Sequence, residues 1–275
     1  MEQRGQQERL HLKSLRSKVE GERDLSFLQS FLTPIQRWTD KQLGDYHMHF
    51  NEGSATMEKI VAVAMITRRL LLEEPETTSQ SLPISDRDQI EIYISSSIKN
   101  AFSRTVQVVE RTDMSNEHPL ALLAEELKKL LKRESVTFLP VLSQRHPQAT
   151  VVSGSLVHKL YGLRLKPFLD GAEHLTEDVI SVFPAAESLE QFIMALIASV
   201  CQEENAEIML KKLNLYQIET KSGTLVLRWV NSQLGRILGW VERVFQQEVN
   251  PLSILLYCQI PVVLIMFITE TFLKV

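Results

Sequence analysis

The sequence predicts an all-α protein of eight or more helices without a β-sheet. Composition is the first observation: the 275 residues include 39 Leu but only 10 Gly and 10 Pro, a balance that favours helices over sandwiches and barrels. Periodicity is the second, because apolar residues recur at intervals of three and four along most of the chain. The 44% hydrophobic and 23% charged residues are typical of a globular chain, and the length predicts one extended or two compact units.

The first half of the chain divides into four segments. Residues 1–23 mix six Lys/Arg with four Asp/Glu and predict a charged helical lead-in. Thr33, Pro34 and Gln36 match a capping box that restarts a helix, and from there one face carries Ile35, Trp38, Leu43, Tyr46 and Phe50. Residues 57–74 are apolar around most of their circumference and predict a well-buried helix that Pro75 ends. Ser85 and Asp88 form a second capping box, and the helix that follows should bury Ile90, Ile94, Ala101, Phe102 and Val109.

The second half continues the series of helices. His118 and Pro119 open a helix with an apolar stripe of Leu122, Leu123, Leu127, Leu130 and Leu131 and an i,i+4 pair of Glu125 and Lys129. Pro140 and Pro147 predict a kink or break between them. Residues 150–166, with two Gly, predict a looser helix ended by Pro167, and residues 175–183 lead to Pro184. Ser188 with Gln191 then predicts a new helix start, and residues 203–214 a short charged helix.

The last long helix, residues 224–248, has the most regular apolar spacing in the chain. Its intervals alternate between three and four, as at the contact positions of a coiled coil. This seam predicts a partner helix, either within the protein's own bundle or from another protein. Its members are Leu227, Val230, Leu234, Ile237, Val241 and Val244.

Charge and cysteine content exclude several classes of protein. A net charge of −4 and a pI near 6.0 give no reason to expect nucleic acid as a partner. Cys201 and Cys258 are the two cysteines, too few for a disulfide framework or a Cys-rich metal site. We therefore expect a reduced, cytosolic setting. The first ten residues lack the apolar core of a signal peptide.

The search for catalytic chemistry finds no catalytic, cofactor or metal site. The chain has neither a Walker phosphate loop nor a G-x-S-x-G elbow. His47 and His49 point to different faces of a helix, so they cannot share a metal, and we expect them at a solvated helix end. We predict an interaction protein without a cofactor and not an enzyme. The alternative is a helical enzyme whose site is assembled from scattered residues, for which His118, Glu125 and Lys129 are the candidates.

A basic cluster lies on the polar side of the helix that His118 opens. Its members are Lys128, Lys129, Lys132 and Arg133. The cluster is typical of an exposed polar face, and contact with anionic lipid or an acidic partner is the functional alternative.

Three long stretches carry a resemblance to a known family. They are PIQRWTDKQLGDYHMHF, EKIVAVAMITRRLLLEEPE and LRWVNSQLGRILGWVERVFQQEV, the last followed by Asn250-Pro251. In this order and spacing they resemble plant members of the Munc-homology (MUN-domain) family, relatives of the UNC-type vesicle-priming proteins. The resemblance covers roughly residues 10–251.

The resemblance implies a fold, a role and partners. The fold would be an elongated stack of antiparallel helical bundles, a rod like the subunits of vesicle-tethering complexes. The role would be docking or priming of exocytic vesicles and delivery of plasma-membrane proteins, in the cytoplasm at the surface of vesicle or plasma membrane. SNARE or tethering-complex proteins would be partners and plasma-membrane proteins the cargo. No residue that contacts a SNARE carries over to a position of this chain.

The resemblance also divides the chain and marks where it departs from the family. Residues 24–250 resemble part of the family sequence, 1–23 form the lead-in and 251–275 an apolar tail. Family members are several times longer, and they carry a Trp between the positions of Val249 and Asn250, followed by a polar helical continuation. Since this chain switches to other sequence there, we expect a truncated form. Its last long helix should then be more exposed at Val241, Val244 and Phe245 than at Leu227 and Val230.

The tail has three interpretations. Residues 252–269 are 18 residues without a charge, about 27 Å as a helix against a hydrocarbon core of about 30 Å. The segment is a gene-model artefact such as a translated intron, a membrane anchor, or a buried final helix. As an anchor it would leave the body in the cytosol, because Arg228, Arg236 and Arg243 precede it and only Lys274 follows.

Overall fold

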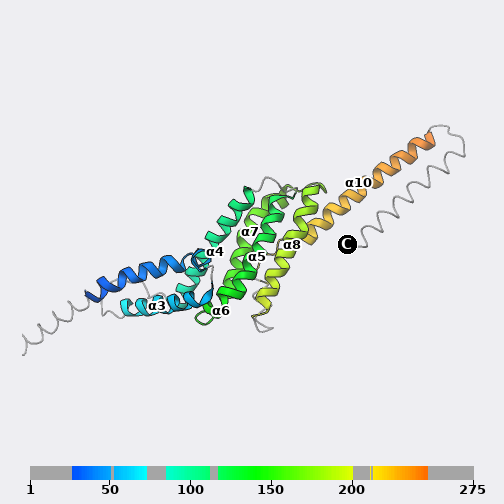
Figure 1. The fold of residues 1–275 in the computed structure, drawn as a ribbon. Helices are drawn as coiled ribbons and strands as arrows, with labels where there is room; N and C mark the ends of the chain where they lie inside the picture. Colours follow the sequence, from blue (N-terminus) through cyan, green and yellow to red (C-terminus); the bar gives the residue numbers. More distant parts are fainter. Residues whose placement is uncertain are drawn as a thin grey trace, which may run out of the picture.

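The computed structural model describes residues 27–50, 53–72, 85–111, 117–200, 211 and 213–246, and within them every regular element is a helix (Figure 1). The all-α prediction is confirmed. The elements are a helix over 27–43, α2 (Tyr46–His49), α3 (Ser54–Leu72), α4 (Asp86–Glu110), α5 (Pro119–Arg133), the π-helix η1 (Glu134–Phe138), α6 (Leu139–Leu142), α7 (Ala149–Gly171), α8 (Glu177–Ala198) and α10 (Ile218–Gln246).

Some sequence predictions fall outside these residues. They concern the lead-in 1–23, most of the short helix 203–214, both cysteines and the apolar segment 252–269. The side chains of Val244 and Phe245 also lie outside the described set.

The core is a bundle of four helices in which successive helices alternate in direction. The start of α7 meets the end of α8, where Gly154 packs on Ile193 and Ile197, so these two helices are antiparallel. Helices α4 and α7 are parallel, because Arg87 reaches Gln148 at their starts and Arg164 reaches Glu110 at their ends. Helix α5 contacts each of the other three helices, α4, α7 and α8. The up-down arrangement follows from the short connections between successive helices.

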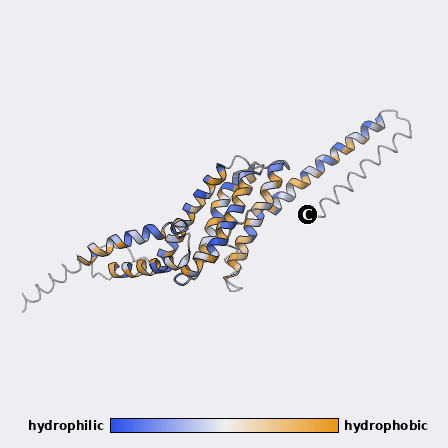
Figure 2. Ribbon diagram, in the orientation of Figure 1, coloured by the Kyte–Doolittle hydropathy of each residue, from blue (hydrophilic) through white to orange (hydrophobic). Residues whose placement is uncertain are grey.

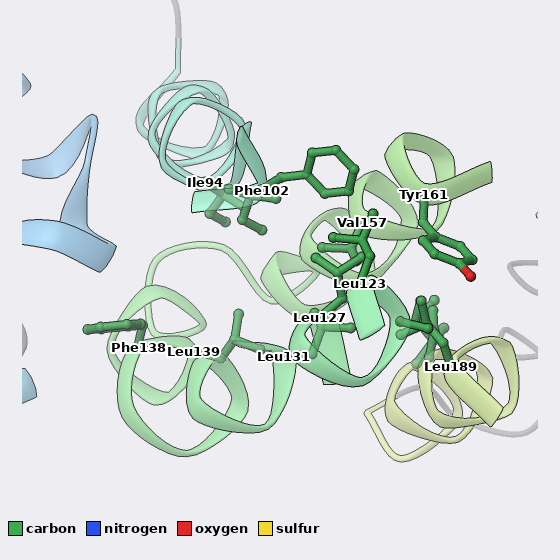
Figure 3. Close-up of a cluster of buried hydrophobic side chains, with 14 of the residues drawn as sticks. Ile94, Phe102, Leu123, Leu127, Leu131, Phe138, Leu139, Val157, Tyr161 and Leu189 are labelled. Atoms are coloured by element: carbon green, nitrogen blue, oxygen red, sulfur yellow. The ribbon is translucent and has the colours of Figure 1, made fainter. Parts of the chain in front are cut away.

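Apolar side chains from all four helices meet in the centre of this bundle (Figure 3). Each large side chain removed from water contributes about 1.5–3 kcal/mol. The stripe predicted on α5 is largely confirmed, since Leu123, Leu127 and Leu131 are buried while Leu122 and Leu130 are half-buried. The five residues predicted for the buried face of α4 are all buried: Ile90, Ile94, Ala101, Phe102 and Val109.

Helix starts follow local sequence where a capping side chain is present. Ser85 and Asp88 form the predicted capping box, with 3.2 Å hydrogen bonds in both directions. His118 caps α5 ahead of Pro119, and its Nδ1 accepts from the backbone N–H of Leu120 at 3.2 Å. Both predictions are confirmed, because a cap acts within three residues of its own position.

Three predicted proline boundaries are wrong. The helix 27–43 runs through Thr33 and Pro34 without a restart. Pro167 and Pro184 lie inside α7 and α8, and Thr176, rather than Ser188, caps α8. A proline inside a helix costs about 3 kcal/mol, which burial on both sides offsets: Val182, Phe183, Ala186 and Leu189 are all buried around Pro184.

The break predicted between Pro140 and Pro147 is confirmed as the turn over 143–148, and a distortion precedes it. The turn before Pro140 widens into the π-helix η1. In a regular α-helix the ring of Pro140 would meet the carbonyl group of Val136, four residues earlier. The wider turn relieves this contact and lets α5 continue into α6.

Two predicted buried faces are only partly buried. Trp38 is 51% exposed, whereas Leu43, Tyr46 and Phe50 are buried. On α3, Met57 and Met65 are buried but Ile66 is 58% exposed, so the helix is not buried on all sides. The reason is position: both helices lie at one end of the molecule, beside each other rather than inside the bundle (Figure 1).

The helices form an elongated arrangement, as the resemblance implies. The pair formed by 27–43 and α3 lies at one end, the bundle is central, and α10 projects from the other end (Figure 1). Among the described helices, α8 has the length and apolar content of a membrane-crossing helix. Its face with Val182, Leu189 and Ile193 packs inside the bundle, as in core helices of soluble proteins.

Candidate interaction surfaces

Within the described part of the chain, three of the six residues of the apolar seam on helix α10 are exposed. Ile218 and Leu225 anchor its first turns and are 3% and 2% exposed, whereas Leu227, Val230 and Leu234 are 66%, 44% and 50% exposed. Apolar residues continue along the projecting part of the helix (Figure 2). Among the described residues the seam is therefore not packed within the protein's own bundle.

The expected higher exposure near the end of this seam is wrong at Val241, whereas Val244 and Phe245 lie outside the described side chains. Ile237 and Val241 are half-buried, and Val241 is thus less exposed than Leu227. Leu225 is the last buried residue in the described part of α10, so exposure begins at Leu227 rather than near the helix end.

The predicted basic cluster on α5 is partly neutralised by its own helix. Lys128 lies 3.1 Å from Glu125 and also donates to Ser188 Oγ at 3.0 Å, and Lys129 lies 2.7 Å from Glu126. The hydrogen bond and charge of Glu126 raise the pKa of Lys129. The predicted i,i+4 pair of Glu125 and Lys129 is replaced by these two i,i+3 pairs. Lys132 and Arg133 are exposed on the same helix.

The residues considered for a scattered enzyme site do not come together. His118 is occupied as the cap of α5 and its ring packs 4.9 Å from Phe168. Glu125 lies two turns along that helix and pairs with Lys128. Across the part of the chain that the structure describes, no three His, Cys, Asp or Glu residues are grouped as metal ligands would be.

A groove of about 980 Å³ lies between α7 and the segment that leads into α10. We call it the α7 groove. Along α7 it is lined by Val151, Ser155, His158, Lys159, Gly162, Leu163, Lys166, Leu169 and Asp170, and on the other side by 213–217, Thr220, Lys221 and Thr224. Sequence reasoning missed this groove, because its two walls are brought together only by the fold.

A hydrogen-bonded cluster holds the floor of the α7 groove in place. Glu190 Oε1 lies 2.8 Å from His158 Nε2 and accepts from the backbone N–H of Tyr216 at 2.9 Å. The Tyr216 hydroxyl donates to the carbonyl of His158 at 2.7 Å, and the two rings stack with centroids 4.2 Å apart. Burial, with the nearby charge of Glu190, raises the pKa of Tyr216.

A second polar cluster is fully enclosed in the core. Glu134 accepts a 2.6 Å hydrogen bond from the Tyr46 hydroxyl, and its other oxygen lies 2.7 Å from His47 Nε2. The Ser97 hydroxyl accepts from the backbone N–H of His47 at 3.1 Å and lies 2.8 Å from His47 Nδ1. Burial, followed by the charge of Glu134, raises the pKa of Tyr46. This cluster joins α2, α4 and η1, and its enclosure suits it to holding these elements together.

The solvated position expected for His47 is therefore wrong, while that of His49 is confirmed. The two histidines do point to different faces, as the i,i+2 spacing requires. One signal could have identified the burial of His47: it lies four residues after Leu43 and three before Phe50, on the apolar face that these residues define.

Comparison with known proteins gives two matches. A family model described as "UNC13 third domain" matches residues 1–81. "Protein unc-13 homolog" from Arabidopsis thaliana is 63% identical over 247 residues, which cover 90% of this chain and 22% of the relative. The chain thus spans about a fifth of the length of this relative. No solved structure matches the chain.

Proposed function

The chain belongs to the unc-13 homologue family, and from that premise we propose that it is a scaffold of exocytic membrane traffic. The proposed role is in the docking or priming of vesicles and in the delivery of plasma-membrane proteins. The observation that carries the proposal is the 63% identity over 90% of the chain. The chain corresponds to about a fifth of that relative. The proposed role therefore has to be tested on the chain itself.

The proposed partners are SNARE or tethering-complex proteins, which supply helices. The seam of α10 is the surface that suits such a partner, since Leu227, Val230 and Leu234 are exposed at coiled-coil spacing. Helix-in-groove and coiled-coil contacts use apolar residues at these intervals. The proposed location is the cytoplasm, peripheral to vesicle or plasma membrane, where the exposed side chain of Lys132 could contact anionic headgroups.

Binding to purified partners tests the scaffold role. The full chain is immobilised and presented with SNARE and tethering-complex subunits, beside the full-length relative as a positive control. We expect capture by the chain, and loss of capture by the Leu227→Ser, Leu234→Ser double variant. The matched control is Val136→Ser, because Val136 is also exposed, at 73%, but lies on η1 rather than α10.

Two results would contradict the proposal in different ways. Capture by the full-length relative but not by this chain would place the activity elsewhere in the family sequence. Equal loss of partner capture in the α10 variant and in the Val136→Ser control would show that α10 is not the contact surface.

The membrane location has a separate test. Residues 252–269 lie outside the described residues, and the peripheral location is proposed over a membrane span through them. Extraction of membranes with alkaline carbonate should release the expressed protein into the supernatant. Retention in the pellet would show a membrane anchor and contradict the peripheral location.

A further inference from the structure

We propose that the α7 groove binds an acidic amphipathic helix of a partner protein. The inference goes beyond the scaffold role by assigning a binding site that is separate from the α10 seam and by stating the chemistry of its ligand. It is tested with purified components, so that its outcome is independent of any role in vesicle traffic.

The groove has the length and spacing of a helix-binding site. The α7 side is one continuous helical face, with lining residues at Val151, Ser155, Lys159, Leu163, Lys166 and Asp170, at intervals of four, four, four, three and four. These 20 positions extend over about 28 Å at 1.5 Å per residue. A partner helix of about 18 residues would match that length.

This face of α7 is left open by the bundle. The other faces of α7 contact α4, α5 and α8. On the open face Leu163 is 63% exposed, and Leu215 on the opposite wall is 44% exposed. These two large apolar side chains lie on opposite walls and are exposed to water. A helix with an apolar stripe would bury them, which would favour binding.

The charge of the lining indicates the sign of the partner. Lys159, Lys166 and Lys221 line the groove, and their ammonium groups make no hydrogen bond or ion pair within the described chain. Asp170 is the acidic residue among the described lining positions. Three positive charges and one negative leave +2 on this surface, in a chain of net charge −4. A partner with an apolar stripe flanked by carboxylates is complementary to it.

The spacing of the lysines favours a helix over one small anion. Lys159 and Lys166 lie two turns apart on α7, about 10.5 Å along its axis, so their ammonium groups are spread along the groove rather than converging. Carboxylates seven residues apart on a partner helix have the same spacing.

The second wall is held in position before any partner binds. Tyr216 is fixed by its bonds to Glu190 and His158, and Gly162 allows its close approach, since a Cβ there would lie 2.8 Å from Tyr216 Cε1. Gln217 has a φ of 56° and sets the turn into α10. A preformed wall reduces the ordering cost of binding.

The test uses three synthetic 18-residue helical peptides with the same apolar stripe. The stripe carries Leu at helical spacing, and the flanking positions are Glu in the first peptide, Gln in the second and Lys in the third. Binding to the full chain is measured by fluorescence anisotropy at low and high salt. We expect the Glu peptide to bind about tenfold or more tighter than the Lys peptide and to weaken as salt rises.

Charge-reversed variants locate the binding. Lys159→Glu with Lys166→Glu should weaken the Glu peptide about tenfold or more and strengthen the Lys peptide. The matched control is Lys41→Glu with Lys99→Glu, which makes the same change of charge at two exposed lysines outside the groove. The control should bind as the unchanged chain does, and circular dichroism should show equal helicity in all three proteins.

Five results would overturn the proposal. Equal binding of the Glu and Lys peptides would show that charge complementarity does not determine binding. Equal weakening of Glu-peptide binding in both double variants would show that the lysines of the groove have no specific role. Vesicles of phosphatidylserine and phosphatidylcholine that bind through Lys159 and Lys166, without binding of the Glu peptide, would assign the surface to a membrane. Self-association in analytical ultracentrifugation that Lys159→Glu with Lys166→Glu abolishes would assign it to a second copy. Tighter binding of the Glu peptide after Glu203→Gln with Glu204→Gln would show that these two carboxylates of the chain compete for the groove, and would assign the groove to the chain's own acidic segment.

Discussion

Glu134 is a buried side chain on which the stability of a polar cluster in the core depends. Its carboxylate is fully enclosed and contacts Tyr46 on one oxygen and His47 on the other. A buried polar group that loses its partner costs far more than the net gain of forming the contact. The cluster should therefore be sensitive to the loss of any one member.

Removal of this carboxylate is the first prediction. Glu134→Ala should lower the free energy of unfolding by about 3–5 kcal/mol, since Tyr46 and His47 would remain buried without an acceptor. Urea denaturation measures the loss. Glu126→Ala is the control, because Glu126 is partly exposed and its pair with the exposed Lys129 is screened by solvent, so its loss should change stability far less. A loss of less than 1 kcal/mol in Glu134→Ala would contradict the structural role.

Gly162 provides a prediction about close approach. Gly162→Ala would place a Cβ 2.8 Å from the Tyr216 ring, and the displaced ring would cost roughly 1–3 kcal/mol of stability. Gly235→Ala on α10 meets nothing within 4 Å, so it should gain up to about 1 kcal/mol from helix propensity. Thermal unfolding of the two variants should move in opposite directions, and equal shifts would rule out the contact with Tyr216 as the cause.

His146 predicts the direction of a pH dependence. Burial, with the charge of Arg87, lowers its pKa even though Glu91 lies 3.7 Å away. The folded state then binds fewer protons than the unfolded state, so this contribution to stability is present above about pH 6.5 and is lost as pH falls through the folded pKa. Denaturation at pH 7.5 and 5.5 should show a smaller loss for His146→Asn than for the unchanged chain. An equal loss would exclude His146 as a source of the pH dependence.

At the scale of the element, the burial of apolar side chains on α10 changes along the helix. Its first part is anchored by Ile218 and Leu225, whereas Leu227, Val230 and Leu234 further along are exposed. The same helix thus contains positions that hold the fold together and positions that are free for a partner. Sequence spacing alone does not separate them, because Leu225 and Leu227 are both leucines in one regular helix.

Two substitutions on α10 separate these roles. Leu225→Ala should cost about 2–5 kcal/mol of stability, because Leu225 is 2% exposed. Leu227→Ser should change stability by no more than about 0.5 kcal/mol and should reduce self-association of the chain. Denaturant unfolding and light scattering measure the two effects. A large destabilisation by Leu227→Ser would mean that the seam is packed in the folded chain.

At the scale of the whole molecule, the helices are arranged along one direction (Figure 1). A compact domain of 275 residues would have a radius of gyration of about 19 Å. The elongated arrangement predicts a value several ångström larger in X-ray scattering of the full chain at low concentration. A value near 19 Å would contradict the rod and leave the helical fold unaffected.

The sequence by itself determined the helical class and the positions of most helices. The caps at Ser85 and His118 and the buried faces of α4 and α5 could be predicted because each depends on residues within one or two turns. The family could also be identified from sequence, since long stretches carry the resemblance.

Only the tertiary structure decided which local signals prevailed and which residues met. Pro167 and Pro184 end no helix, because burial along α7 and α8 outweighs their local cost. Tyr46 and Glu134 are 88 residues apart in sequence, and no local pattern predicts that α7 and the segment leading into α10 form the two walls of one groove. The physical reason is common to these cases: capping and periodicity act within a few residues, whereas burial depends on which helix faces the fold brings together.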